Sequence, residues 1–526
     1  MTNTILIKEF LETVVKSMSA QTFEQDHALR NTGKVQFDKI KEKGIEQELF
    51  TFLKNDYANE MTIYIDLMLY LYYMLDEVDF LLEYEKAWLE KELQGEDDLF
   101  VEICLEDQIW SNEFGNNKER EFDKVWERNE KLLKKMQEKL QIEYDIVPTQ
   151  QRNDELVVLV VSQLLSVAHA PSKLVLEFAY AIQKYLKKRV LILNTSIQAD
   201  YEGLQKRGVP NIPLYLYNNW KEGNKRFDIE YKGEVFATWQ VMIERNNVAE
   251  MKKIIEDVYQ LKPLCVWNFG AIDAYAGVMK QFTTYIYMFL TQGYPPVWAD
   301  ILVNYIKSER PQDLENEKFL KENGVQIKKI GFLFPYDKPI GKISRSEWGI
   351  PDDAFCIGVI GNRLENECSD KFYDVISQVV QNADIYVIFI GKNTETLPDL
   401  AIKNASMQNK YRFTGYVDEL MEYLTLIDLF VDPPRRGGGN GAAMAMSIGK
   451  PVITLAEGDV ATVAGDKFIV NSLDQFAETI VRYKNDENFY KEQSKSAIER
   501  INEQTTSEEE LADLIGQVLT LAEEKK

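Results

Sequence analysis

The sequence predicts an α/β protein in which an all-helical region precedes two doubly wound domains built on parallel sheets. Three observations lead to this prediction. The chain contains no proline before Pro148, and its early segments are rich in Glu, Lys and Leu at helical spacing. Two later sets of short apolar runs alternate with helical stretches, which is typical of parallel sheets covered by helices. A segment rich in Pro, Gly and turn residues, 328–355, separates the two sets.

Composition limits the classes of partner. The chain has 526 residues, 45% of them hydrophobic, and a formal charge of −24. Affinity for nucleic acid or anionic membranes comes largely from Lys and Arg, so we expect no nucleic-acid partner. The four cysteines are scattered without C-x-x-C spacing, which favours reduced thiols in a cytoplasmic protein. They are Cys104, Cys265, Cys356 and Cys368.

The helical region is expected to form a domain over residues 1–150. Its start lacks a basic segment followed by a long apolar core, so no secretory signal is expected. The most apolar stretch, "MTIYIDLMLYLYYML" (61–75), is too short to span a bilayer and carries Asp66. We therefore expect a buried helix and no transmembrane segment, with a contact to a membrane surface or a partner as the alternative. The region could bind a polypeptide, support an oligomer or a partner protein, or cover the core.

The first α/β domain is expected over residues 151–330. The continuous apolar run "DELVVLVVSQLL" (154–165) is typical of a parallel strand that is buried on both faces. A helical pattern (172–188) and a second apolar run, "RVLILNT" (189–195), complete a strand–helix–strand unit. Further strands are expected at 263–269 and 299–305.

The second α/β domain is expected over residues 331–485, followed by a helical tail over 486–526. Five apolar runs predict its strands, with helical stretches between them. These runs are 355–361, 384–391, 411–417, 428–433 and 451–455.

A glycine-rich stretch, "DPPRRGGGNGAAMAM" (432–446), follows one of these strands and opens a helix. The first N–H groups of a helix have no intrahelical partner, and the helix dipole favours an anion there. Glycine also lets a phosphate approach the backbone. We therefore expect an anion site with Arg435 and Arg436 alongside, although a tight turn at a flexible helix start is the alternative. Its members are Gly437, Gly438, Gly439, Asn440 and Gly441. The spacing matches neither a P-loop nor a dinucleotide fingerprint.

Three motifs in the C-terminal half resemble those of GT-B glycosyltransferases, and in particular the GT4-like retaining family. They are "IGVIGNRLENECSDKF" (357–372), "RFTGYVDELMEYLTLIDLFVDP" (412–433) and "GGGNGAAMAMSIGKPVITL" (437–455), in the family's order. The resemblance spans about residues 355 to 470. It implies the GT-B fold, with two facing Rossmann-like domains, and transfer of a sugar from a nucleotide-sugar donor. It also implies that Arg363 and Lys371 stabilise the leaving diphosphate, although the spacing between these two is longer than usual. Solvated surface side chains are the alternative for both.

The resemblance also implies how the rest of the donor is held. The base would lie against the loop near Tyr416, through backbone atoms. Many family members hold the donor ribose with a carboxylate on the helix after the glycine loop, but the matching position here is Met444. Glu457 and Asp459 in the following loop could supply that contact instead.

His169 lies in the loop after the first strand, just before a helix, in "VVLVVSQLLSVAHAPSKLVLEF" (157–178). This segment resembles the enzymes that add N-acetylglucosamine or glucose to polypeptides, which carry a histidine in a similar loop. An imidazole there could polarise an acceptor or contact a donor phosphate, while packing or capping of the helix is the alternative. Asp273 in "NFGAIDAYAG" could act as a base, with a helix N-cap as its alternative.

Together these features predict a cytoplasmic glycosyltransferase that moves a sugar from a nucleotide sugar, expected to be a UDP-sugar, to a protein or surface-glycan acceptor. We expect no metal and no permanently bound cofactor, because Arg363 and Lys371 would neutralise the leaving group and no Cys/His cluster has zinc spacing. A non-catalytic adaptor or chaperone of GT-B fold, serving a partner glycosyltransferase or a glycosylated adhesin, is the alternative. Met444 and the large helical region favour that alternative. A phosphorylase or an epimerase on the same fold is a third option.

Overall fold

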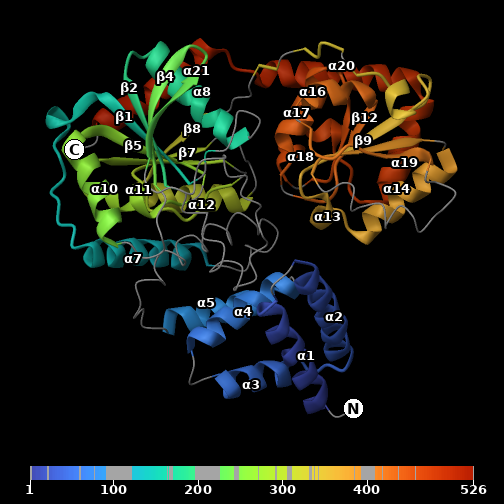
Figure 1. Ribbon diagram of the computed structural model, residues 1–526, viewed down its shortest axis with the longest axis horizontal. Coiled ribbons are helices and arrows are strands. Elements are labelled where there is room, and N and C mark those ends of the chain that lie inside the picture. The colour runs from blue at the N-terminus through green and yellow to red at the C-terminus, as the bar shows by residue number, and fades with distance from the viewer. Residues whose placement is uncertain are drawn as a thin grey trace.

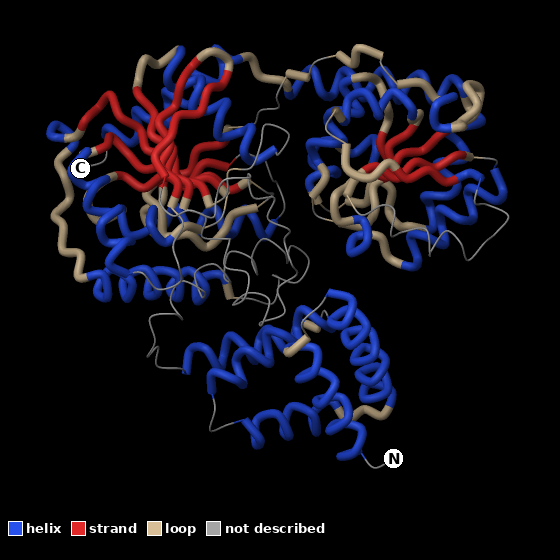
Figure 2. Tube along the Cα trace, in the orientation of Figure 1, coloured by secondary structure: helices blue, strands red, loops and turns tan. Residues whose placement is uncertain are grey.

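The computed structural model contains an N-terminal group of helices and two sheets, each flanked by helices (Figure 1). In the tube view the strands of the two sheets form two separate groups (Figure 2). The structure describes residues 3–20, 23–57, 61–75, 77–90, 121–162, 164, 170–195, 225–241, 248–270, 272–290, 293–304, 311–330, 335–336, 338–341, 343–383, 385–392, 409–417, 419–435, 437–456 and 458–524.

The five N-terminal helices pack mainly on one another. The apolar stretch forms α4, and its side chains Met68, Leu69 and Leu71 are fully buried, which confirms the prediction of a buried helix. Tyr70 donates a hydrogen bond from its hydroxyl to Ser17 Oγ at 2.6 Å and joins α4 to α1. No helix in the part of the chain that the structure describes combines the length and the apolar character needed to cross a membrane. The five helices are α1 (Asn3–Met18), α2 (Phe23–Glu42), α3 (Glu46–Tyr57), α4 (Met61–Leu75) and α5 (Val78–Glu90).

Helix α7 (Phe122–Leu140) connects these helices to the first sheet. Trp126 donates its indole N–H to the Val297 carbonyl at 3.2 Å, and Asn129 Nδ2 donates to the Pro296 carbonyl at 2.8 Å. On its other side, Arg128 Nη2 donates to the Tyr84 hydroxyl at 2.9 Å. The buried hydrophobic side chains therefore form one continuous cluster from the helical region to a face of the first sheet.

The first sheet has the strand order β3-β4-β2-β1-β5-β6-β7-β8, and every neighbouring pair is parallel except β3–β4. Central strand β1 is buried on both faces from residue 156 onward, as expected from its apolar run. Helices α8 (Ala170–Lys184) and α10 (Val248–Leu261) supply crossovers, and α12 (Pro311–Glu322) precedes the last strand. The strands are β1 (Asn153–Val161), β2 (Arg189–Asn194), β3 (Lys225–Tyr231), β4 (Glu234–Gln240), β5 (Pro263–Phe269), β6 (Thr284–Phe289), β7 (Ile301–Asn304) and β8 (Gln326–Lys329).

Three features of this sheet were not predicted: the strands β6 and β8 and the antiparallel β3–β4 hairpin. The hairpin turns through Lys232 and Gly233, which both have positive φ, at 51° and 78°. Two consecutive positive φ values suit the right-handed twist of a tight hairpin, and glycine adopts them at little cost. The signal in the sequence was the pair "KG" between two runs of alternating polarity.

The second sheet is entirely parallel, in the order β11-β10-β9-β12-β13. The chain starts in the middle with β9, adds β10 and β11 on one side, and returns to add β12 and β13 on the other. The order therefore reverses between β9 and β12, which makes this pair the topological switch point. The strands are β9 (Cys356–Ile360), β10 (Tyr386–Ile390), β11 (Tyr411–Phe413), β12 (Leu429–Val431) and β13 (Val452–Ile453).

The C-terminal helices divide between the two sheets. Helix α20 (Glu487–Gln504) packs on α17 (Gly439–Ser447) of the second domain, whereas α21 (Glu508–Glu524) packs on α8 of the first. Lys232 Nζ lies 2.7 Å from Glu177 of α8 and 2.6 Å from Glu508 of α21, and fixes that contact. The C-terminus accordingly lies beside the first domain (Figure 1).

Candidate functional site

The loops that follow β9 and β12 meet at the switch point of the second sheet. Such a crevice, outside the carboxyl ends of parallel strands, is where open α/β sheets bind ligands. Residues 361–363 leave β9, and residues 432–435 leave β12. The glycine stretch follows the second loop and opens α17.

Two glycines at the start of α17 lie in close packing. Gly438 is the N-cap of α17 with φ 98°, and a Cβ there would lie 2.5 Å from Arg435 Nη2. A Cβ on Gly439 would lie 3.0 Å from Asp459 Cβ, at the start of α18 (Asp459–Ala464). The first i to i−4 bond of α17 runs from the Ala442 N–H to the Gly438 carbonyl at 3.1 Å. The N–H groups before Ala442 are therefore outside the intrahelical ladder, as an anion site requires.

Arg435 lies beneath this glycine stretch and is buried. Its side chain is 4% exposed, with Nε 2.8 Å from Asp432 Oδ1 and Nη1 2.9 Å from Glu367 Oε2. Burial opposes the charged guanidinium, but the two carboxylates outweigh it, so the pKa of Arg435 is raised further above its ordinary range. This differs from the expectation of an arginine whose side chain is presented to a ligand. Its paired carboxylates draw the guanidinium inward.

Asp432, which pairs with Arg435, is itself only 2% exposed. Burial raises the pKa of Asp432 to about 6, against the opposing effects of Arg435 and of a hydrogen bond from Thr454. Thr454 donates its hydroxyl to Asp432 Oδ2 at 2.9 Å. Asp432 thus has a hydrogen-bond donor on each oxygen.

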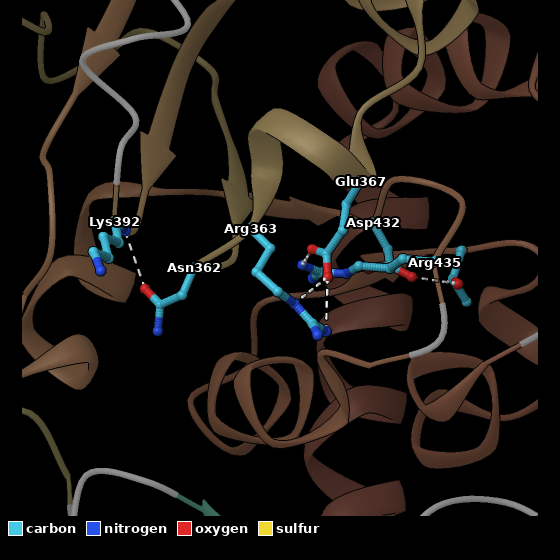
Figure 3. A network of polar contacts seen from close by, with 7 residues as sticks. Asn362, Arg363, Glu367, Lys392, Asp432 and Arg435 are labelled. Carbon is cyan, nitrogen blue, oxygen red and sulfur yellow. Dashed lines mark hydrogen bonds and ion pairs between the residues drawn. The ribbon is translucent and has the colours of Figure 1, made fainter. Parts of the chain in front are cut away.

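Arg363 forms the exposed end of the same network (Figure 3). Its side chain is 49% exposed, and Nη2 lies 3.0 Å from Glu367 Oε1. Glu367, at the end of the short helix α13 (Leu364–Glu367), therefore pairs with Arg363 through one oxygen and with Arg435 through the other. The neighbouring Asn362 Oδ1 accepts the Lys392 N–H at 3.0 Å and links the loop after β9 to the loop after β10.

Lys371 does not join this cluster. It lies in the first turn of α14 (Asp370–Ala383), is 62% exposed, and pairs with Asp474 of α19 (Asp474–Asn485) at 3.3 Å. The structure therefore places Arg363 and Lys371 in two separate ion pairs.

The remaining donor-site candidates surround α17. Tyr416 is half-exposed in the loop after β11, and the Gly415 carbonyl accepts the Gly391 N–H at 3.1 Å. Asn440 accepts a hydrogen bond from Tyr336 of the interdomain segment at 2.9 Å and contacts Met444 Sδ through Nδ2 at 3.6 Å. A thioether thus fills the position at which the resemblance implied a carboxylate, while Asp459 lies beside Gly439.

In the first domain, Asp273 is the N-cap of α11 (Ala274–Met279), as its alternative interpretation held. Its carboxylate accepts the N–H groups of Tyr275 and Ala276 and the hydroxyl of Thr195, and it is fully buried. Burial raises the pKa of Asp273 to about 6. His169, Glu457 and Arg436 lie outside the described residues.

The sequence interpretation missed Glu367 and Asp432. Both carried a signal: Glu367 follows Arg363 at i+4, the spacing of a helical ion pair, and Asp432 directly follows a buried strand. Neither signal shows that the two carboxylates converge on Arg435, because that depends on the pairing of β9 with β12.

Comparison with known proteins identifies the domain that holds this site. Residues 354–486 match the family model described as "Glycosyl transferases group 1". A UDP-N-acetylglucosamine–N-acetylmuramyl-(pentapeptide) pyrophosphoryl-undecaprenol N-acetylglucosamine transferase of Caldicellulosiruptor saccharolyticus is 21% identical over 286 residues, which cover 52% of this chain and 72% of that protein.

Solved structures show the same fold. A Thermobaculum terrenum O-GlcNAc transferase variant superposes with a TM-score of 0.53 at 9% identity, covering 99% of this chain and 98% of that one. A Rickettsia africae glycosyltransferase superposes with a TM-score of 0.50 at 12% identity, covering 70% and 99%.

The family match and the shared fold point to a glycosyltransferase of the GT-B class, which confirms the predicted fold and enzyme class. Its C-terminal α/β domain is similar to the group 1 glycosyl transferases over residues 354–486.

Proposed function

We propose that the protein transfers a sugar from a UDP-sugar to a protein or surface-glycan acceptor. The observation that carries the proposal is the glycine-built start of α17 at the switch point, with the Arg435 guanidinium buried directly beneath it. A diphosphate needs N–H donors and positive charge in one place, and this position offers both. The names of the C. saccharolyticus and T. terrenum relatives, which act with N-acetylglucosamine, support a UDP-sugar as the donor.

In the proposed reaction, the bond between the anomeric carbon and the β-phosphate oxygen breaks, and its electron pair stays on the phosphate. The acceptor atom forms the new bond to the anomeric carbon and loses its proton to a base or to water. Negative charge therefore grows on the β-phosphate, where the α17 amides and Arg363 would stabilise it. Arg435 would add a fixed positive charge from the buried side of the glycine stretch. We keep the expectation that no metal is needed, but assign the stabilisation to Arg363 and these amides, because Lys371 lies in a separate ion pair with Asp474.

The other parts of the proposal concern the acceptor and the surroundings of the enzyme. The acceptor would enter from the first α/β domain, beside the loop that carries His169. Asp459 would approach the donor ribose from the start of α18, because Met444 offers no carboxylate. The N-terminal helices would bind the acceptor, a partner protein or a second copy of the chain, and the protein would work in the cytoplasm without a nucleic-acid partner.

Binding and turnover of UDP-sugars test the proposal. Purified protein is titrated with UDP, and UDP-glucose and UDP-N-acetylglucosamine are followed for release of UDP. We expect binding below millimolar concentration and slow donor hydrolysis. Gly438→Ala should weaken UDP binding about tenfold or more, because its Cβ meets the Arg435 guanidinium at a positive φ. Gly324→Ala is the matched control, since it has a similar φ of 83° but no atom within 4 Å of its Cβ. No binding of UDP at millimolar concentration would contradict the proposal.

A non-catalytic adaptor or chaperone is the second candidate. Two observations favour it: Met444 replaces the usual carboxylate, and both Arg363 and Lys371 are already paired with carboxylates. An adaptor should keep its cellular function in the Arg363→Ala variant and lose it when residues 1–118 are deleted, a deletion that keeps α7 on the first sheet domain. An enzyme should lose its function in the Arg363→Ala variant.

A further inference from the structure

The switch point holds a chain of alternating charges that runs from the interior to the surface. Asp432, Arg435, Glu367 and Arg363 follow one another in contact (Figure 3). Thr454 donates its hydroxyl to Asp432 at the inner end. The two carboxylates balance the two guanidinium groups, so the cluster is neutral. A neutral cluster is a poor attractor for a diphosphate, which raises the question of how the site gains positive charge when the donor arrives.

Arg435 cannot supply that gain by moving. Asp432 and Glu367 hold two of its nitrogens, and a Cβ at Gly361 or Gly438 would lie 2.3 or 2.5 Å from the guanidinium. Because Gly361 and Gly438 have no side chains, their backbones can lie directly against the guanidinium. Its third nitrogen, Nη2, is buried and has no hydrogen-bond partner among the described residues. It lies next to the N-cap of α17, where the amides outside the helical ladder gather.

Arg363 is placed to move. It is half-exposed, and in the described part of the chain its side chain is held by Glu367 alone. An i, i+4 ion pair with one exposed partner contributes little to stability, so a stronger anion can replace Glu367 at little cost. The nearest atom to a Cβ on Gly437 is Arg363 Nη2, at 3.6 Å, so the guanidinium already lies beside the glycine stretch.

Given the donor site proposed above, we propose that Glu367 is a built-in counter-anion that competes with the diphosphate of the donor for Arg363. In the ligand-free protein Glu367 neutralises both guanidinium groups. When the donor binds, Arg363 exchanges Glu367 for a phosphate oxygen, while Glu367 and Asp432 keep Arg435 fixed below. Glu367 is thus a positioning residue that weakens donor binding and keeps the site from retaining other anions.

Removing the charge of Glu367 tests this exchange. In the Glu367→Gln variant the diphosphate no longer competes with a carboxylate, so UDP should bind about threefold more tightly, as expected from the strength of the lost ion pair. Uridine, which lacks phosphates, should bind as it does to the unaltered protein. A merely structural role would change both affinities together. Glu487→Gln is the matched control, because it removes the same charge from an exposed i, i+4 pair with Lys491 in α20.

A double variant isolates the pair. Adding Arg363→Gln to Glu367→Gln should abolish the gain in UDP affinity, because the gain acts through Arg363. Should Glu367→Gln fail to unfold cooperatively, Glu367→Asp decides the matter. The aspartate keeps a carboxylate near Arg435 but is too short to reach Arg363 as well. UDP should therefore bind this variant more tightly than the unaltered protein, while uridine should bind both equally.

The outcomes separate this proposal from the proposed function. If the unaltered protein binds UDP but Glu367→Gln binds it equally or more weakly, the exchange is overturned and the donor site stands. If the gain persists in the double variant, the exchange is likewise overturned. If the unaltered protein binds no UDP, both proposals fall.

Discussion

Asp273 shows how one side chain can stabilise a helix start and still make stability depend on pH. The carboxylate caps α11 with two backbone hydrogen bonds and accepts the hydroxyl of Thr195, yet it is fully buried and faces no cation among its hydrogen-bond partners. Burial outweighs these hydrogen bonds and raises its pKa from 3.8 to about 6. The folded protein is therefore less stable when Asp273 is an ionised carboxylate than when it is a protonated carboxylic acid.

The raised pKa of Asp273 predicts that the free energy of unfolding changes between pH 4 and pH 7. The folded protein binds the proton more tightly than the unfolded chain, so the contribution of Asp273 is fully present below pH 3.8 and is lost as pH rises through about 6. The loss should amount to about 3 kcal/mol of unfolding free energy. The Asp273→Asn variant keeps an oxygen that can cap the helix but has no titrating carboxyl. The unfolding free energy of this variant should therefore fall less over this pH range. Urea unfolding at several pH values measures the slope. An equal slope in both proteins would contradict the assignment.

The site also shows what a single sequence can reveal about residues. The start of a helix at the glycine stretch was predicted from the sequence, and α17 begins there at Gly439, while its role as an anion site stays a prediction. The inward orientation of Arg435 could not be predicted, since it depends on Glu367, which is distant in sequence and reaches Arg435 only because β9 pairs with β12. Asp432 stands only three residues before Arg435 in the sequence, but the sequence alone does not show that its carboxylate is buried.

At the scale of elements, Lys232 holds the C-terminal helix on the first domain. It bridges Glu177 of α8 and Glu508 of α21 from the turn of the β3–β4 hairpin. Burial opposes its charge, but the two carboxylates outweigh burial and raise the pKa of Lys232. Three elements that are distant in sequence thus depend on one ammonium group.

Lys232→Met is expected to loosen α21. The methionine keeps much of the apolar stem but leaves the buried Glu177 without a cation, at a cost of about 1–2 kcal/mol. Hydrogen exchange should accelerate in α21 and in the β3–β4 hairpin, and little in the second sheet. Lys184→Met is the control, because Lys184 lies on α8, as Glu177 does, but pairs with Glu234 only at 3.9 Å and is half-exposed. Unchanged exchange in α21 would show that apolar packing alone holds the helix.

The apolar runs of the strands predicted most of the elements, because a parallel strand covered on both faces must be apolar throughout. The missed strand β6 contains Thr284, Tyr285 and Tyr287, whose polar atoms interrupt such a run. In the structure Tyr285 and Tyr287 donate their hydroxyls to Asn268 Oδ1 and the Gly270 carbonyl. The position of α21 was not predictable either, since an amphipathic pattern defines a buried face but not the surface that it contacts.

At the scale of the whole molecule, α7 determines where the helical region ends and the GT-B core begins. The expected boundary near residue 150 assigns α7 to the helical region. Its hydrogen bonds to the carbonyls of residues 296 and 297 attach it to the first sheet domain, and a Cβ on Gly277 of α11 would meet Leu133 of α7 at 2.5 Å. Such close packing is typical of the interior of one domain.

Two truncations test this division. A chain of residues 119–526 keeps α7 and should fold cooperatively. A chain of residues 146–526 exposes the face that Leu132, Leu133, Met136 and Leu140 cover, and should lose several kcal/mol of unfolding free energy. Urea unfolding and gel filtration compare the two chains. If both chains fold equally well, α7 belongs to the N-terminal helices.

The return of α21 to the first domain also orders the events of synthesis. One face of the first sheet is completed by Leu511, Ile515, Val518 and Leu519, which are synthesised after the whole second sheet. The second sheet and its helices, by contrast, occupy one uninterrupted stretch of chain and can close as soon as it emerges. The domain that is translated first is therefore finished last, and a nascent chain halted before α21 would expose an apolar surface for chaperones to cover.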